Sequence, residues 1–312
     1  MDNKSFFNRN KFTIILISIM VIITLIVFFI GQTPKEKTPP VGILMMFILL
    51  IVGFAAGLLG GWIGTGGCSV MLPILHFWLG FPASIAVGTT LVAVIFTSIS
   101  GGYGHFIRKN LDKRVALWMG GFGVLGVILG SWLFTFLSGK SALLGFIIGI
   151  VFLWPAIRMI WDGIIGYRKR KADAKSNTST STQIQSINGH PTKLSVFGFI
   201  VGILTGIVGL GGGYALVPGL IYLFGAPVYI TMGTSLAVMI PMAVVGGAIK
   251  LAQGYVFLLA ALILGIGTII GAQVGAATIK KFKPYTLKLI FGIYFLYVAI
   301  KFIGTFLGIR VW

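Results

Sequence analysis

The sequence predicts an all-α, polytopic membrane protein made of two inverted repeats of about five segments each, plus one N-terminal helix. Three observations predict this class. Of the 312 residues, 57% are hydrophobic and only 9% are charged, whereas about 25% of the residues in a soluble domain are charged. Apolar runs of roughly bilayer length recur along the chain. The second half also repeats the pattern of the first.

The first forty residues form an N-terminal tail and an additional transmembrane helix, region 1–40. Lys4, Arg9 and Lys11 precede an apolar run from Phe12 to Ile30. This run is longer than the core of a signal peptide, and no small-residue cleavage site follows it. We therefore expect an uncleaved helix.

Apolar segments then define two membrane repeats. In the first repeat, 41–161, the expected segments are 41–60, 62–79, 84–106, 115–137 and 141–161. In the second repeat, 194–312, they are 194–208, 210–224, 228–250, 256–279 and 285–306. The segments 62–79 and 210–224 are short, so each either crosses the membrane or re-enters it. The stretch 162–193 between the repeats is basic and then rich in Ser, Thr and Asn, which predicts a flexible cytoplasmic linker.

The duplication is visible when the sequence is shifted by 145 residues. Gly64-x-Gly66-Gly67 then falls on Gly209-x-Gly211-Gly212, and Pro73 falls on Pro218. Of the 50 positions from 53 to 102, 19 are identical at this offset, far more than composition would produce. Such duplicated membrane units are common among secondary transporters.

The basic residues indicate the orientation of each repeat. In the first half, the loop after the third segment contains Arg108, Lys109, Lys113 and Arg114, and the next loop contains only Lys140. In the second half, the loop after the third segment contains only Lys250, and the next loop contains Lys280, Lys281 and Lys283. Basic loops face the cytoplasm. The halves are therefore predicted to be inverted, with the N-terminus and 162–193 cytoplasmic and the C-terminus outside.

The strongest candidate site is a pair of glycine–proline segments, 61–75 and 206–220. Dense glycine and an internal proline destabilise a continuous helix, and unwound backbone in a membrane is tolerated where it lines a cavity or is buried in protein. The helix start after each break suits an anion. The candidate substrate-binding residues are Gly64, Gly66, Gly67, Ser69, Thr89, Thr90, Gly209, Gly211, Gly212, Gly213, Thr234 and Ser235. Tyr214 is the counterpart of Ser69 and is another potential donor.

Simpler readings of these residues stay open. Glycines also allow close helix packing, and Thr or Ser hydroxyls often bond back to the preceding helical turn. His105 and Lys250 occupy equivalent repeat positions. They are possible residues of the transport pathway, each near one of the two mouths of that pathway. The alternative for both is a side chain that snorkels to the interface.

The remaining residues exclude several classes of function. Cys68 is the single cysteine, and the three histidines form no metal motif, so we expect no metal, no cofactor and no enzymatic activity. The excess of Lys and Arg is explained by topology, so we expect no nucleic acid partner. No Asp or Glu falls inside a predicted segment, which favours a small anion over a cation as substrate.

The twin glycine–proline segments, with the Gly-x-Pro and Gly-Thr pairs that follow them, resemble the TauE/SafE family of sulfite exporters over about residues 43–306. The resemblance implies transport of a small sulfur-containing anion such as sulfite, sulfoacetate or a related organosulfonate across the cell membrane. The predicted mechanism is a secondary carrier with alternating access. An anion channel is the alternative, and a membrane enzyme or assembly factor a weaker one. The lipid bilayer is the expected surrounding, and the sequence leaves the oligomeric state open.

Overall fold

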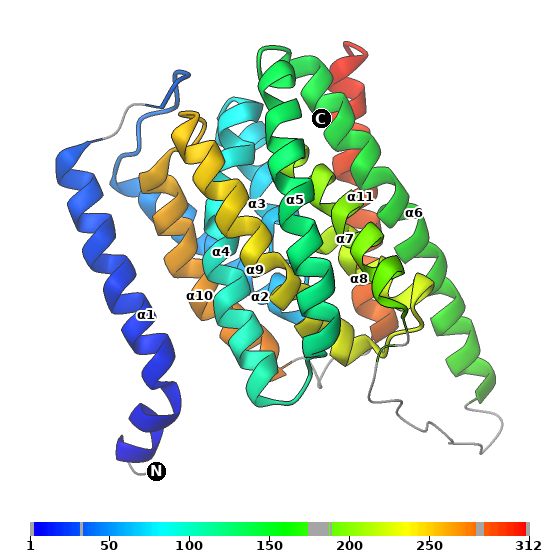
Figure 1. Ribbon diagram of the computed structural model, residues 1–312. Coiled ribbons are helices and arrows are strands. Elements are labelled where there is room, and N and C mark those ends of the chain that lie inside the picture. Colours follow the sequence, from blue (N-terminus) through cyan, green and yellow to red (C-terminus); the bar gives the residue numbers. More distant parts are fainter. Residues whose placement is uncertain (1–2, 32–33, 174–186, 188, 279–283, 310–312) are drawn as a thin grey trace.

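The computed structural model describes residues 3–31, 34–173, 187, 189–278 and 284–309, and all regular structure in this part of the chain is helical (Figure 1). Nine of the described helices are long and apolar enough to cross a membrane. The all-α membrane class is therefore confirmed. Two shorter apolar stretches, Cys68–Trp78 and Gly213–Leu223, accompany these nine helices.

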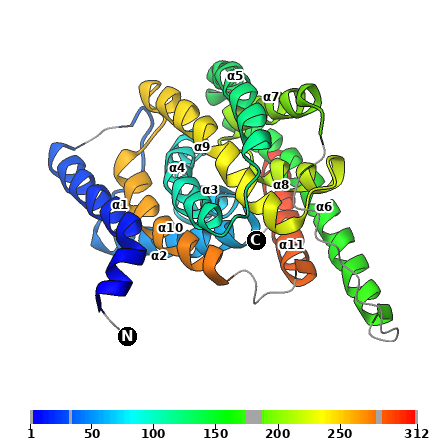
Figure 2. The same ribbon diagram turned by 60° about the horizontal axis from the view of Figure 1, so that its bottom comes forward.

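The helices follow the predicted segments closely. The N-terminal helix and first half comprise α1 (Asn3–Ile30), α2 (Ile43–Ile63), α3 (Cys68–Pro73), the π-helical turn η1 (Ile74–Trp78), α4 (Ala83–Ile107), α5 (Lys113–Ser138) and α6 (Ser141–Asp173). The second half comprises α7 (Pro191–Val208), α8 (Gly213–Leu223), α9 (Val228–Ala252), α10 (Leu258–Thr278) and α11 (Pro284–Phe306). In both views α1 lies at one edge of the bundle, where it contacts α10 (Figures 1 and 2).

One predicted boundary is wrong. The segment expected to end at residue 161 continues as α6 to Asp173, through the first part of the predicted linker. Lys, Arg and Ala are good helix formers, so nothing in this stretch ends the helix. As a result Asp162 lies inside a candidate membrane span, whereas we expected no acidic residue there. Residues 174–186 and 188 of the linker lie outside the described residues.

Helices of one half pack against helices of the other half in two equivalent pairs. Helix α2 packs along α10, and α7 packs along α5. A Cβ added at Gly57 would fall closer than 3.0 Å to the backbone of Thr268, and one at Gly202 would do the same at Gly123. These pairs are related by the 145-residue offset, since 57 corresponds to 202 and 123 to 268. The conserved spacing of glycines within the repeat thus serves the same close helix contact twice.

One equivalent pair of helices, α4 and α9, runs in opposite directions. Helices α4 and α9 correspond by the repeat and pack together in the middle of the bundle (Figure 2). Gly101 near the end of α4 faces Leu236 early in α9, whereas Val92 earlier in α4 faces Gly247 late in α9. Residue numbers therefore rise along one helix as they fall along the other, so the pair is antiparallel.

Candidate functional site

Both glycine segments interrupt their helices as predicted. Helix α2 ends at Ile63, and α3 starts at Cys68. Between them Gly64, Gly66 and Gly67 have φ angles of 79°, 73° and 74°. This left-handed conformation is costly for a residue with a Cβ, which explains why glycine stands at all three positions.

The second break has the same geometry. Helix α7 ends at Val208, and Gly209, Gly211 and Gly212 have φ angles of 71°, 66° and 84° before α8 begins. Among the described residues, no side chain caps the start of α8, so its first N–H groups lack a side-chain acceptor. The duplicated sequence therefore forms a duplicated backbone conformation.

The two breaks lie against each other. The Cys68 thiol donates a hydrogen bond to the carbonyl oxygen of Leu210. At the equivalent position of the other half, a Cβ on Gly213 would lie 2.5 Å from the Cα of Thr65. Position 65 corresponds to 210 and 68 to 213, so the contact is reciprocal. The chain thus brings the glycine candidates of both halves together around a local two-fold axis.

Two apolar side chains cover this meeting point. A Cβ at Gly66 or at Gly211 would fall closer than 3.0 Å to the Met239 methyl carbon, and 3.4 or 2.8 Å from a Val94 methyl carbon. Val94 and Met239 are themselves equivalent in the repeat and lie midway along α4 and α9. Sequence reasoning missed both residues. The offset of 145 pairs them, but nothing in their apolar side chains distinguishes them from ordinary core residues.

Buried hydroxyl groups follow each break. Ser69 in the first turn of α3 and Tyr214 in the first turn of α8 are equivalent, and both are buried. Neither side-chain oxygen has a hydrogen-bond partner in the described part of the chain. Other buried polar atoms of the described residues also lack a partner, so what distinguishes Ser69 and Tyr214 is their equivalent position directly after the two breaks.

The other candidate hydroxyls near the breaks are engaged. Ser235 donates to the carbonyl oxygen of Gly64 over 2.6 Å, which joins α9 to the first break. Thr90 donates to the carbonyl oxygen of Ala86 over 2.8 Å, within its own helix. Ser235 therefore helps to hold the break, and Thr90 follows the back-bonding alternative.

Thr89 and Thr234 are placed elsewhere. The Thr89 hydroxyl accepts the backbone N–H of Phe257 over 3.0 Å, and Thr234 accepts that of Asp112 over 2.9 Å. Phe257 precedes α10 and Asp112 precedes α5. Thr89 therefore ties α4 to the start of α10, and Thr234 ties α9 to the start of α5. Helices α5 and α10 are equivalent in the repeat, so the two bonds are equivalent as well. The structure does not bring these hydroxyls to the glycine breaks.

His105 and Lys250 are both fully buried, which contradicts the snorkelling alternative. One ring nitrogen of His105, Nε2, lies 3.1 Å from the Gly61 carbonyl oxygen. The Lys250 Nζ lies 3.0 Å from the centre of the Phe134 ring and has no hydrogen-bond partner among the described residues. Burying an amine without a hydrogen-bond partner is costly, and such costly ionisable groups in membrane proteins often mark functional sites.

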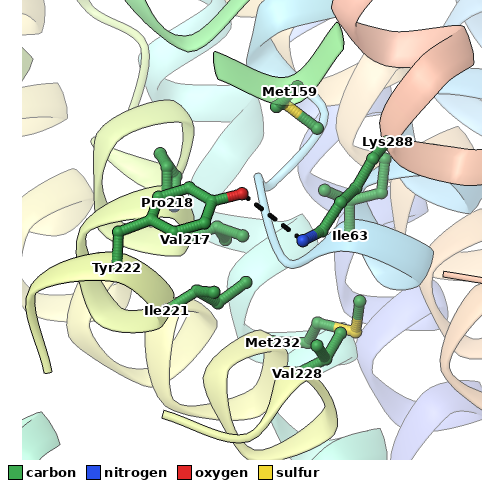
Figure 3. A pocket seen from close by; sticks show the side chains of 9 residues that line it. All are labelled: Ile63, Met159, Val217, Pro218, Ile221, Tyr222, Val228, Met232 and Lys288. Carbon is green, nitrogen blue, oxygen red and sulfur yellow. Dashed lines mark hydrogen bonds between the residues drawn. The ribbon is translucent and has the colours of Figure 1, made fainter. Parts of the chain in front are cut away.

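A narrow cavity of about 30 Å³ reaches the first break from one side of the bundle (Figure 3). This is about the volume of one water molecule. The residues lining it are Ile63, Met159, Val217, Pro218, Ile221, Tyr222, Val228, Met232 and Lys288. Ile63 directly precedes Gly64, and a Cβ on Gly64 would lie 2.6 Å from the Cα of Met232. The inner end of the cavity therefore adjoins the break.

Charged side chains surround the outer end of this cavity. Lys288 donates to the Tyr222 hydroxyl over 3.3 Å, as the dashed line in Figure 3 shows, and its Nζ lies 3.6 Å from an Asp162 oxygen. Arg158 lies 3.9 Å from the other Asp162 oxygen and 4.4 Å from the centre of the Tyr222 ring. Sequence reasoning did not select this cluster. The available indication was that Arg158 and Lys301 align in the repeat with a small gap.

No group of three His, Cys, Asp or Glu side chains that could hold a metal occurs in the described part of the chain. The breaks present backbone N–H groups and hydroxyls, and the cavity that adjoins the first break has cations at its outer end.

Comparison with known proteins places this arrangement in a family. The model of the family "Sulfite exporter TauE/SafE" matches residues 48–302. The chain is 30% identical to the "Probable membrane transporter protein YdhB" of Bacillus subtilis over 230 residues, which is 73% of this chain and 88% of that protein.

Other relatives carry related names. The "Probable membrane transporter protein YunE" of Bacillus subtilis is 27% identical over 83% of this chain and 98% of its own length. The "Sulfite exporter TauE/SafE family protein 3" of Arabidopsis thaliana is 28% identical over 43% of this chain and 28% of its own length. No solved structure matches the chain.

Proposed function

Because the chain belongs to the sulfite exporter TauE/SafE family, and is thus a multi-pass membrane transporter of that type, we propose that it is a secondary carrier for a small sulfur-containing anion. The candidate substrates are sulfite, sulfoacetate and related organosulfonates. The observation that carries the proposal is the meeting of two glycine breaks, each followed by a buried hydroxyl without a partner, Ser69 and Tyr214. Backbone N–H groups and hydroxyls of this kind bind anions without needing a cationic side chain.

The arrangement of the halves supports alternating access as the mechanism of this carrier. In many carriers, two inverted repeats rock around a site at their interface near the bilayer midplane. The antiparallel α4–α9 pair and the reciprocal glycine contacts support such an arrangement here. Met239 lies over both breaks, and its flexible side chain can move to admit the anion.

An anion channel is the rival proposal. It would use the same donors to line a continuous pore. The Val94 and Met239 side chains that cover the breaks are fully buried, which supports a carrier over an open pore. A membrane enzyme would require a catalytic group, which this arrangement does not supply.

Reconstituted protein should separate these functions. Proteoliposomes loaded with unlabelled sulfite should accumulate external labelled sulfite by counterflow, and sulfoacetate should compete. Empty liposomes and liposomes loaded with chloride are the controls. A carrier gives counterflow, whereas a channel gives only flux down the gradient. Absence of any flux for sulfite, sulfoacetate and organosulfonates would contradict the proposed substrate class.

The orientation can be tested separately. With Cys68 replaced by alanine, Ser179→Cys should resist an impermeant maleimide in intact cells and react after permeabilisation, because we expect the linker 162–193 to be cytoplasmic. Trp312→Cys is the matched control and should react in intact cells. Labelling of the two positions in the reverse order would invert the assignment while leaving the duplication intact.

A further inference from the structure

We propose that Arg158, Lys288 and Tyr222 form a second anion-binding site at the outer end of the cavity, and that the Asp162 carboxylate occupies this site when substrate is absent. This inference rests on the proposed transport of an anion. In it, the incoming anion displaces Asp162 from the two cations, beside the cavity whose lining includes Ile63 next to the first glycine break.

The contacts of Asp162 support its exchange with a ligand. Its two oxygens lie 3.6 Å from Lys288 and 3.9 Å from Arg158, whereas a tight charge-assisted hydrogen bond is about 2.7–2.9 Å long. The carboxylate thus bridges two cations loosely. Sulfite and sulfonate groups also carry negatively charged oxygens, and these can bind the same two cations.

The cluster is not fully enclosed by the described part of the protein. The side chains of Asp162 and Lys288 are 14% and 21% exposed, and that of Arg158 is 46% exposed. Lys288 and Tyr222 also line the cavity, whose lining includes Ile63, the residue before Gly64.

The repeat supplies an internal comparison at the other end of the bundle. Lys301 occupies the repeat position of Arg158, and Phe77 that of Tyr222. The Lys301 Nζ lies 5.0 Å from the Phe77 ring centre, as Arg158 lies 4.4 Å from that of Tyr222. Both mouths therefore share a cation above an aromatic ring.

The position of the carboxylate differs at the Lys301 end. Thr305 stands at the repeat position of Asp162, and Lys301 makes no ion pair with any described residue. Phe302 stands where Met159 lines the cavity; its buried ring lies 4.6 Å from that of Phe77 and 5.6 Å from that of His76. Aromatic packing closes this mouth, while the cavity marks the other one.

Two measurements would test the second site: the binding of anions, and the transport of anions from each side of the membrane. Apparent affinities for sulfite and sulfoacetate would be measured by thermal-shift titration of purified wild type, Asp162→Asn and Lys288→Met. Transport KM would be measured in inside-out and right-side-out membrane vesicles. Lys193→Met, at an exposed position on the linker side of the bundle, removes the same charge away from the cluster and is the matched control.

We expect Asp162→Asn to lower KM about five-fold from the cavity side, because the competing carboxylate charge is gone. Lys288→Met should raise KM about ten-fold from that side only, with the maximal rate within two-fold of wild type. Lys301→Met should raise KM from the opposite side. Lys193→Met should change neither value.

Three results would overturn the inference: an unchanged KM in Lys288→Met, an equal change from both sides, or a raised KM in Asp162→Asn. If wild type transports none of these anions, the proposed function fails, and the binding titration still decides the second site. In that case weaker sulfite binding by Lys288→Met and tighter binding by Asp162→Asn would support it, and unchanged binding would refute it.

Discussion

Gly211→Val should abolish transport, with a loss of at least 100-fold, while the protein still inserts into the membrane. Gly211 has a φ angle of 66°, and a side chain there would enter the space shared by Val94 and Met239. The backbone strain costs about 1–2 kcal/mol, too little to unfold a large helical bundle. The added methyl groups would instead block the approach of an anion to the backbone N–H groups. Labelled sulfite counterflow and size-exclusion profiles of the purified variant give the two measurements.

Gly66→Val should behave in the same way, because Gly66 is the repeat equivalent and faces the same Met239 methyl carbon. Gly102→Ala is the matched control. Gly102 is a buried glycine of α4, but its added Cβ would lie 3.6 Å from the nearest atom, an ordinary contact. Normal transport by Gly211→Val would exclude the breaks as the anion site. Failure of both valine variants to insert would show instead that the breaks serve only the packing of the two halves.

Lys250→Met should make the protein more stable and less active. The fully buried Lys250 amine has no hydrogen-bond partner among the described residues, and methionine is an apolar side chain of similar length. Removing an unsatisfied buried group of this kind gains about 2 kcal/mol, which corresponds to a rise in the melting temperature of about 3 °C for a chain of this length. We expect sulfite transport to fall at least ten-fold, because costly buried ionisable groups in membranes are usually retained for function.

Lys140→Met is the control for Lys250→Met, because Lys140 is exposed between α5 and α6. It should change neither the melting temperature nor the transport rate. A melting temperature of Lys250→Met at or below that of wild type would mean that the amine stabilises the fold. Higher stability combined with full transport would show that Lys250 is not part of the pathway and that its burial only lowers the stability of the fold.

Local sequence was enough to predict the helix breaks. Three positive-φ glycines in each half follow from the glycine spacing, since few other residues tolerate that conformation. The membrane class likewise follows from composition and from the length of the apolar runs. The end of α6 was mispredicted because charge alone suggested a linker, although Lys, Arg and Ala continue a helix without difficulty.

The roles of individual side chains depended on long-range contacts. Thr90 and Ser235 occupy equivalent positions of the repeat, yet Thr90 bonds to Ala86 within its own helix, while Ser235 bonds to Gly64 of the first break. A hydroxyl has the same chemistry at each place. Its partner is chosen by which helix packs beside it, and the repeat offset does not contain that information.

The duplicated pattern, with its glycine breaks, thus follows from the amino-acid order, because backbone conformation and membrane burial are properties of neighbouring residues. Only the folded chain shows that the two breaks touch through Cys68 and Leu210, and that Asp162 lies between Arg158 and Lys288. These contacts join residues from different helices, and their distances are set by how ridges of side chains pack across the bundle. The shape of the cavity beside Gly64 is set by the same packing.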